Sequence, residues 1–177
     1  MAKKIITQLK EYFKAGKRPT EAQFLDLLDS YVHLDNPDFV KTEDVGSTRQ
    51  GIAKSYTTSN GTDTFHIKLP YKTDTNSAMF HIKASGYAYH SGDIIDITWV
   101  GYCYKAGNSL INHKTFVNAA ASITAGQYVG SDKSIYLWFK LSSIYFSSFK
   151  LDSMRVGNGT MLKQGDVEII LSPQAQL

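Results

Sequence analysis

The sequence predicts a mainly β protein, an antiparallel β-sandwich or jelly roll that carries a short helical hairpin at its N-terminal end. Two observations support this fold class. Apolar and polar residues alternate through most of residues 64–177, whereas apolar residues recur every three to four positions within residues 1–33. Turn-forming residues also divide the alternating region into roughly seven or eight short strands, which is typical of a sandwich or jelly roll.

Residues 1–33 are expected to form two amphipathic helices that anchor the chain. Residues 15–19 break the helical period, and Thr20 followed by Gln23 predicts a capping box at the start of the second helix. The apolar stripes consist of Ile5, Ile6, Leu9, Tyr12 and Phe13 in the first helix and of Phe24, Leu25, Leu28, Tyr31 and Val32 in the second. Helices this short are marginal alone, so their stripes require burial against the sandwich, sister chains or a partner surface.

Residues 34–63 are interpreted as a linker or neck. The segment is rich in Asp, Thr, Gly, Ser and Asn, and its apolar residues are scattered. Such a linker weighs against packing of the helices on the chain's own sandwich. Val45 and Ile52 lie seven residues apart and could be two core positions of a very short multichain stalk.

The segment 79–104 is the clearest part of the predicted sheet domain, which spans residues 64–177. Its two arms alternate, and a polar stretch with Gly92 supplies a four-residue hairpin loop. The inward residues are expected to be Phe80, Ile82, Ala84, Ala88, Ile95, Ile97, Trp99 and Cys103. Further strands are predicted at 65–69, ending at Pro70, and at 134–141, 145–151 and 167–171, with irregular pieces between residues 109 and 129.

Six aromatic residues fall on the predicted outward faces of the strands: Tyr87, Tyr89, Tyr102, Tyr104, Tyr136 and Trp138. A contiguous aromatic face on a sandwich is commonly a subunit interface or a ligand-binding surface. The alternative is that the assignment of faces is off by one residue and that these rings fill the core.

Composition narrows the class of protein further. The 177 residues, 42% of them hydrophobic, suffice for one substantial core. The net charge of +3 is spread along the chain, so no nucleic-acid partner is expected. Neither a membrane span nor an export signal is recognisable, which predicts a protein made in a cytosol and kept there or assembled there into something larger. The single cysteine, Cys103, is expected to be a small buried hydrophobe.

The common catalytic motifs do not occur in the sequence, and we expect no enzyme activity, no cofactor and no metal site. His66 and His81 could face each other on adjacent strands and hold a metal, although two such histidines are more often polar surface. Asp93 and Asp96 flank the end of the hairpin and could act as an acid–base pair, but turn formation explains Asp93 adequately.

Two parts of the sequence resemble a known family. The first comprises Phe80-His-Ile-Lys83, Gly86-Tyr87, Thr98-Trp-Val-Gly-Tyr102, Gly107-Asn-Ser109, Ile111-Asn-His113 and Arg155-Val-Gly-Asn-Gly159. This block resembles the C-terminal β domain of fibre proteins of tailed bacteriophages. Residues 13–30 are similar to a helical segment that opens many phage structural and tail-fibre proteins.

The resemblance implies a homotrimeric virion fibre, assembled in the cytoplasm of the host bacterium, with its N-terminus fixed to the particle and a jelly-roll-like head. We expect Ile5, Leu9, Phe13, Phe24 and Leu28 to dock on other virion proteins. We expect Tyr87, Tyr89, Tyr136 and Trp138 to contact a host surface glycan or a neighbouring subunit. The chain lacks the extended shaft of a long tail fibre, so attachment to the tail and to the capsid both remain open. A capsid decoration protein without receptor binding and a carbohydrate-binding module are the alternatives.

Overall fold

The computed structural model of the protein describes residues 6–30, 46–118 and 122–177. The chain divides into two compact units, Met1–Phe39 and Val40–Leu177. Among the described residues, the first unit contains the α-helices, and the second contains all the strands and a short 3-10 helix, η1 (Lys105–Gly107). Within these ranges, no helix has both the length and the apolar character needed to cross a membrane.

The helical unit consists of α1 (Ile6–Tyr12) and α2 (Glu21–Ser30). The predicted capping box at the start of α2 is confirmed. The backbone N–H of Gln23 donates to the Thr20 hydroxyl over 3.3 Å, and the Thr20 N–H donates to Oε1 of Gln23 over 3.0 Å. These two bonds satisfy donors that a helix N-terminus otherwise leaves unpaired, and they fix where α2 begins.

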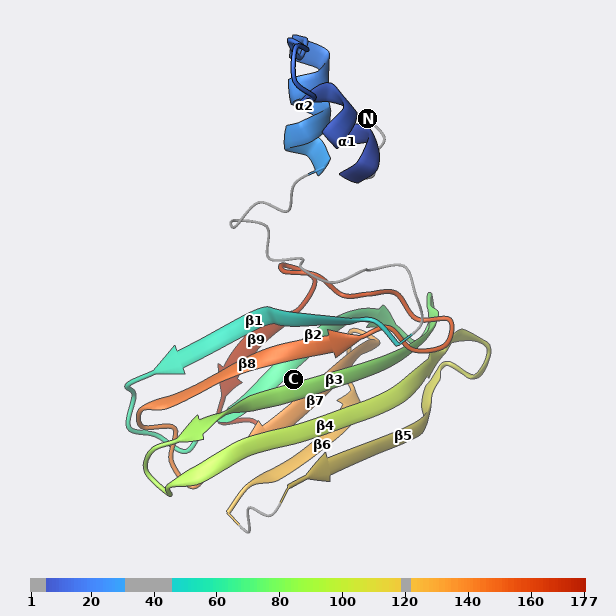
Figure 1. Ribbon diagram of the computed structural model, residues 1–177. Helices are drawn as coiled ribbons and strands as arrows, with labels where there is room; N and C mark the ends of the chain where they lie inside the picture. Colours follow the sequence, from blue (N-terminus) through green and yellow to red (C-terminus); the bar gives the residue numbers. More distant parts are fainter. Residues whose placement is uncertain (1–5, 31–45, 119–121) are drawn as a thin grey trace. The chain divides into compact units, whose positions relative to one another are not determined.

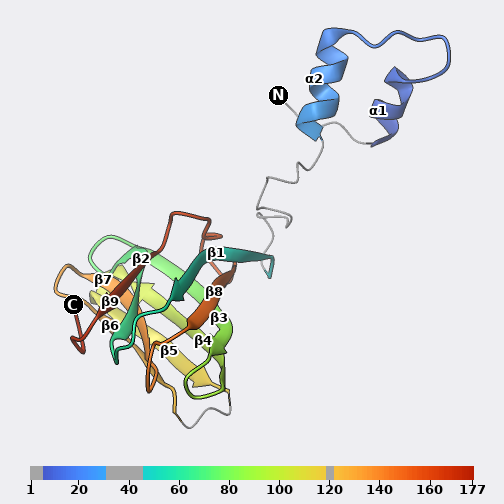
Figure 2. The same ribbon diagram turned by 90° about the vertical axis from the view of Figure 1, so that its left-hand side faces the viewer.

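The second unit is a sandwich of two antiparallel sheets (Figures 1 and 2). Its strands are β1 (Thr48–Thr57), β2 (Thr64–Lys72), β3 (Ser77–Ala88), β4 (Asp93–Tyr104), β5 (Ser109–Val117), β6 (Thr124–Val129), β7 (Ser134–Lys140), β8 (Ser147–Met154) and β9 (Glu168–Ser172). The five-stranded sheet has the order β1-β8-β3-β4-β5 and faces the viewer in Figure 1. The four-stranded sheet, β6-β7-β2-β9, lies behind it.

The predicted fold class, mainly β with an N-terminal helical part, is confirmed. The connections combine two patterns. Strands β1 and β8 pair in one sheet while β2 and β7 pair in the other, so the chain wraps around itself as in a jelly roll. Strands β3, β4 and β5 instead follow one another as a meander within the five-stranded sheet.

The predicted central hairpin is the β3–β4 pair. Ala88 pairs with Asp93, so four residues form the loop, as predicted. The eight residues expected to face inward are all buried, and Ile82, Ala84, Ile95, Ile97 and Trp99 are among those with no measurable exposure. The alternation of side chains along a strand therefore sets which face of β3 and β4 meets the core.

The core lies between the two sheets and is closed along one side by β6. The indole N–H of Trp99 in β4 donates to the carbonyl of Gly126 in β6 over 3.0 Å. The side-chain amide of Gln127 donates to the carbonyls of Val100 and Lys114 at 3.1 and 2.9 Å. These bonds join the two sheets and satisfy polar groups at an edge of the core.

The linker predicted over residues 34–63 is wrong from residue 48 onward, because β1 (Thr48–Thr57) belongs to the five-stranded sheet. The sequence obscured this strand because, in its second half, Lys54 and Tyr56 face outward while the inward positions carry small side chains, Ala53 and Ser55. Ile52 is buried in the sandwich core, so it is not a position of a stalk. Val45 lies outside the described residues.

The strand predicted to end at Pro70 instead continues to Lys72. Proline is tolerated here because the ladder does not need its missing N–H. Pairing with β9 ends at Lys68, and the register with β7 shifts between Lys68 and Lys72. The region from 109 to 129, predicted as irregular pieces, forms the regular strands β5 and β6.

Candidate functional site

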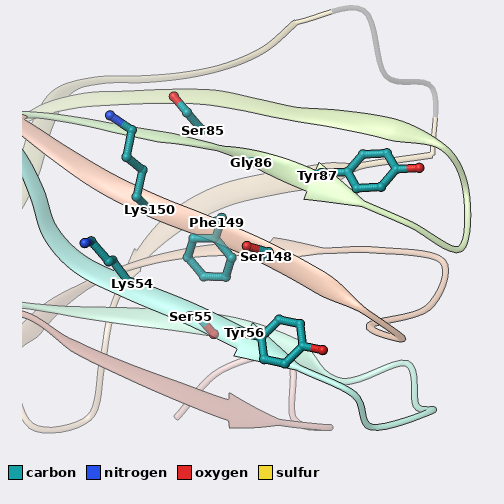
Figure 3. A pocket seen from close by; sticks show the side chains of 9 residues that line it. All are labelled: Lys54, Ser55, Tyr56, Ser85, Gly86, Tyr87, Ser148, Phe149 and Lys150. Atoms are coloured by element: carbon teal, nitrogen blue, oxygen red, sulfur yellow. The ribbon is translucent and has the colours of Figure 1, made fainter.

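The outer face of the five-stranded sheet carries an open cavity of about 640 Å³ (Figure 3). We call it the tyrosine trough. Its lining comes from three neighbouring strands: Lys54, Ser55 and Tyr56 of β1, Ser148, Phe149 and Lys150 of β8, and Ser85, Gly86 and Tyr87 of β3. The volume falls in the range of known ligand pockets, which is about 300–1,000 Å³.

Two tyrosines flank Ser148 at one end of the trough. Tyr56 pairs with Ser148 on one side, and Tyr87 pairs with Ser148 on the other. The two rings are 65% and 50% exposed, although side chains of this size dominate the interior of most domains. Figure 3 shows both hydroxyl groups pointing in the same direction, away from the lysines.

The floor of the trough is main chain. The side chain of Phe149 points into the core, where its ring lies 5.1 Å from that of Phe65 and 5.0 Å from that of Phe139. Gly86 has no side chain, and a Cβ atom there would lie 2.1 Å from the carbonyl oxygen of Ser148. Glycine at this position therefore allows the close approach of β3 and β8.

Two lysines line the other end of the trough. Lys54 and Lys150 are directly opposite each other on β1 and β8, and Ser85 follows on β3. Asp152 forms an ion pair of 2.9 Å with Lys150. Like charges directly across a strand pair are destabilising. Because one carboxylate faces two ammonium groups, positive charge is in excess at this end.

An arc of five aromatic residues surrounds the tyrosine end of the trough, and we call it the aromatic arc. Its neighbouring ring centroids are 4.5–6.5 Å apart, within the range of favourable aromatic contacts. In contact order its members are Tyr56, Phe146, Tyr145, Tyr89 and Tyr87. Four of the five are exposed, so the arc forms a continuous aromatic rim.

Phe146 adopts a backbone conformation that is unfavourable for its residue type. Its φ is +49°, in the left-handed region that glycine and asparagine adopt at low cost. The segment is fixed by two backbone bonds, since Ile144 donates to Gly61 over 2.9 Å and Ser147 donates to Ile144 over 3.1 Å. Backbone strain of this kind occurs often at ligand-binding sites.

Of the four residues predicted to contact a glycan or a subunit, the structure brings two together. Tyr87 and Tyr89 belong to the aromatic arc and are exposed. Tyr136 and Trp138 lie on β7 in the other sheet. Tyr136 is buried, with its ring stacked on Tyr128 at 5.1 Å, so little of its side chain is accessible to a glycan or a subunit. Trp138 is half-buried and covers Gly126.

The site residues that sequence analysis missed are Tyr56, Tyr145, Phe146 and the two lysines. Tyr56 and Lys54 fell in the segment taken for a linker. The predicted strand 145–151 includes Tyr145 and Phe146, but β8 begins at Ser147, so both residues belong to the β7–β8 connection. A signal was present in the adjacent aromatic residues 145 and 146, but the sequence alone does not place them beside β1 and β3.

The residues predicted to dock on other proteins are not equally accessible. Leu9 is buried within the described structure, which leaves little of its side chain accessible to a partner. Phe13 and Phe24 contact each other edge to face at 5.8 Å and are still 44% and 50% exposed. Leu28 is also exposed. Ile5 lies outside the described residues.

The considered metal pair does not form. His66 lies on β2 and His81 on β3, in different sheets, so they are not neighbours on adjacent strands. Among the described residues, no group of three or more histidine, cysteine, aspartate or glutamate side chains is placed to hold a metal ion. Cys103 is buried in the core as predicted, and burial raises the pKa of its thiol to about 11.

The two hairpin aspartates have separate hydrogen-bond partners. Asp93 accepts from the hydroxyl of Ser122, and this bond lowers the pKa of its carboxyl group. Asp96 pairs with Lys83 at 2.9 Å and accepts from the side chain of Asn118 at 3.1 Å, which also lowers its pKa. Both carboxylates are thus held ionised, which favours a structural role over proton transfer.

Comparison with known proteins finds no match: no family model, no curated protein and no solved structure corresponds to this chain.

Proposed function

We propose that this chain is a structural fibre protein of a tailed-bacteriophage virion and that it is a homotrimer without enzyme activity. Its N-terminal helices fix it to the particle, and its sandwich attaches to the host surface. The proposal follows the resemblance of residues 13–30 and 80–159 to phage fibre proteins. It also draws on the contrast between the two units of the chain.

The observation that carries the proposal is the exposed apolar side of the helical unit. Phe13, Phe24 and Leu25 are 44%, 50% and 42% exposed, although α1 and α2 together are only two short helices. Burying a side chain of this size is worth about 1.5–3 kcal/mol. A surface that covers these three residues would therefore stabilise the helices and hold the chain to a larger particle.

The sandwich suits the role of a displayed head. Its core contains at least ten side chains that are essentially inaccessible, among them Trp99, Phe139 and Ile67, so its fold has a source of stability apart from the helices. The same unit carries the tyrosine trough on an outer face. An anchor with exposed apolar residues and a head with an exposed cavity together favour an attachment protein.

A carbohydrate-binding module is the second candidate, and the aromatic arc favours it. Exposed aromatic rings beside polar side chains are a common way to bind sugars. Sugar binding by such a module does not require the exposed apolar side chains of α1 and α2. The two candidates therefore differ in whether the helices bind a particle.

The experiment is incorporation of the full-length protein into phage particles. Phe24→Asp and Leu25→Asp place a charge on the apolar side of α2, and each is expected to lower the copy number per virion at least tenfold, measured by mass spectrometry of purified particles. Ala22→Asp, also exposed on α2, is the matched control and should incorporate normally. Light scattering of the full-length protein should give three times the mass of one chain.

The proposal fails if purified virions do not contain the chain. It also fails if the Phe24 and Leu25 variants incorporate as well as the Ala22 control. Binding to host cells by free protein, with no incorporation into particles, would favour the carbohydrate-binding module.

A further inference from the structure

We propose that the tyrosine trough binds a saccharide chain containing a sugar acid, with the aromatic rings contacting the sugar rings and the lysine pair contacting a carboxylate. This inference rests on the proposed function, because it names the ligand class by which the sandwich would attach to a surface. Its geometry comes from β1, β8 and β3 and from the connection before β8.

The tyrosines set the size of the ligand. Paired positions on neighbouring strands lie about 5 Å apart, so Tyr56 and Tyr87 are separated by about 10 Å across Ser148. A separation of this size exceeds one sugar ring. The two tyrosines therefore contact different sugar units of an oligosaccharide. Sugar rings have apolar C–H faces, and these stack on aromatic rings while their hydroxyl groups remain hydrated.

Hydrogen-bonding groups lie where the edges of such a ligand would be. The side chains of Ser148 and Ser85 both belong to the outward face, since each pairs with an outward residue of a neighbouring strand. Each hydroxyl can donate and accept, as can the hydroxyls of the two tyrosines. The trough thus alternates aromatic surface with hydroxyl groups, which matches the alternation of C–H and O–H groups on a saccharide.

The lysine pair selects the charge of the ligand. Lys54 and Lys150 face each other across β1 and β8, an arrangement that costs stability in the free protein. Asp152 offsets part of this repulsion through its contact with Lys150. A carboxylate between the two ammonium groups would accept a charge-assisted hydrogen bond from each and relieve the remaining repulsion.

Phe146 gives independent support. A phenylalanine with a φ of +49° destabilises the fold relative to glycine at the same position. Its ring joins Tyr56 to Tyr89 in the aromatic arc, with centroid distances of 6.4 and 5.9 Å. The side chain is 39% exposed and its ring contacts are with the aromatic arc outside the core, where a ligand can reach it.

A second copy of the chain is a less suitable occupant. In a two-fold contact whose axis runs along the trough, the lysine pair of one copy would approach the same pair of the other, and the repulsion would grow. A saccharide that carries negative charge complements both ends of the trough. Self-association through the trough is therefore an outcome of the test that overturns the proposal.

The test is binding of defined oligosaccharides to the full-length protein, measured by calorimetry and by amide chemical shifts. The probes are a trisaccharide of galacturonic acid and the uncharged trisaccharide of galactose. We expect the acidic probe to bind at least tenfold more tightly, to weaken as salt is added, and to shift the amide signals of Gly86 and Ser148.

Four variants test the tyrosines, the lysine pair and Phe146 separately. Tyr56→Ala and Tyr87→Ala are each expected to weaken binding of the acidic probe about tenfold or more. Lys54→Gln with Lys150→Gln should remove the preference for the acidic probe over the neutral one. Phe146→Gly removes both the ring and the cost of its positive φ, so it should weaken binding while the protein stays folded, as checked by thermal unfolding.

The matched controls are Phe116→Ala and Lys114→Gln, which change an exposed aromatic residue and an exposed lysine of β5 on the same sheet. Both should bind the acidic probe as the unchanged protein does. The proposal is overturned if the acidic probe does not bind, or binds equally after Tyr56→Ala and Tyr87→Ala. It is also overturned if these substitutions change the oligomeric mass instead.

Failure of this inference can be told apart from failure of the proposed function. A chain that incorporates into virions but does not bind the acidic probe contradicts only the sugar-acid assignment. A chain that binds the probe through the trough but is absent from virions contradicts only the proposed function.

Discussion

The hydroxyl of Tyr128 lies 3.0 Å from Nδ1 of His66, and both side chains are buried on the outer side of the four-stranded sheet. The C-terminal residues cover this pair. The other ring nitrogen of His66 lies 3.0 Å from the carbonyl of Gln174, and the N–H of Leu177 donates to the Tyr128 hydroxyl over 3.0 Å. Because the Gln174 carbonyl can only accept, Nε2 carries the proton and Nδ1 accepts from Tyr128.

This arrangement predicts that the protein loses stability as the pH falls below about 6.5, the ordinary pKa of histidine. Burial lowers the pKa of His66, and the Gln174 carbonyl opposes the shift only in part. A lowered pKa means that the folded state binds the proton less well than the unfolded state does. The stability contributed by neutral His66 is therefore present above the pKa that histidine has in the unfolded state. It is lost as the pH falls toward the lower pKa of the folded state.

The check on His66 is urea unfolding at pH 7.5 and 5.0. The loss of stability between these values should shrink in His66→Gln and persist in His113→Gln, an exposed control. Some loss should remain in both, because burial also lowers the pKa of His81. An unchanged pH dependence in His66→Gln would contradict the assignment.

We predict that ionised Asp132 stabilises the fold and that this contribution is lost at low pH. Partial burial opposes its ionisation, but hydrogen bonds from Lys68 and Ser134 outweigh burial and lower its pKa to about 2. The Lys68 contact is 2.6 Å, and both side chains are about one-third exposed. After allowance for solvent screening, Asp132→Asn should lower the free energy of unfolding at pH 7 by about 1 kcal/mol.

The difference between Asp132→Asn and the unchanged protein should disappear as the pH falls from about 4 to about 2, because the carboxyl group is then protonated. Chemical denaturation across this pH range measures it. Asp74→Asn, at an exposed aspartate, is the control and should stay within about 0.5 kcal/mol. A constant difference at every pH would show that the charge of Asp132 is not responsible.

Trp99 is predicted to be the most costly core position to change. The indole is fully buried, and its N–H bonds to Gly126 across the two sheets. Trp99→Phe leaves that carbonyl without its donor and should destabilise by about 2 kcal/mol, whereas Trp99→Ala should cost about 3–5 kcal/mol. Trp138→Phe, at a half-buried tryptophan, should cost less than half as much as Trp99→Phe, as measured by thermal unfolding.

Position 159 is predicted to have no room for a side chain, so that only glycine fits there. A Cβ atom there would lie 2.0 Å from the backbone oxygen of Met79, which cannot move aside as a flexible side chain would. The neighbouring Asn158 bonds to the backbone of Met79 and Ser77 and holds this segment against β3. Gly159→Ala should therefore cost at least about 2 kcal/mol.

Gly61→Ala is the matched control for Gly159→Ala. Its nearest neighbours would be at ordinary contact distances of 3.6 and 3.8 Å, so a change of less than about 0.5 kcal/mol is expected. Equal effects at both glycines, measured by urea unfolding, would contradict the steric explanation.

The sequence by itself determined the fold class, the capping of α2 and the inward faces of β3, β4 and β7. These features depend on local periods and on residues three or four apart, which the chain order contains directly. It also placed Tyr87 and Tyr89 on an outer surface. It did not identify β1, because the half of the strand with Lys54 and Tyr56 on one face and Ala53 and Ser55 on the other has a weak alternation.

Only the tertiary structure decided which residues form the candidate site. Tyr56, Tyr87 and Phe146 are far apart along the chain and meet because β8 lies between β1 and β3 and because the segment before β8 turns back over them. Burial of Tyr136 was likewise decided by the neighbouring strand, which supplies Tyr128 as its stacking partner. Strand order follows from long-range pairing, and no local pattern in the sequence encodes it.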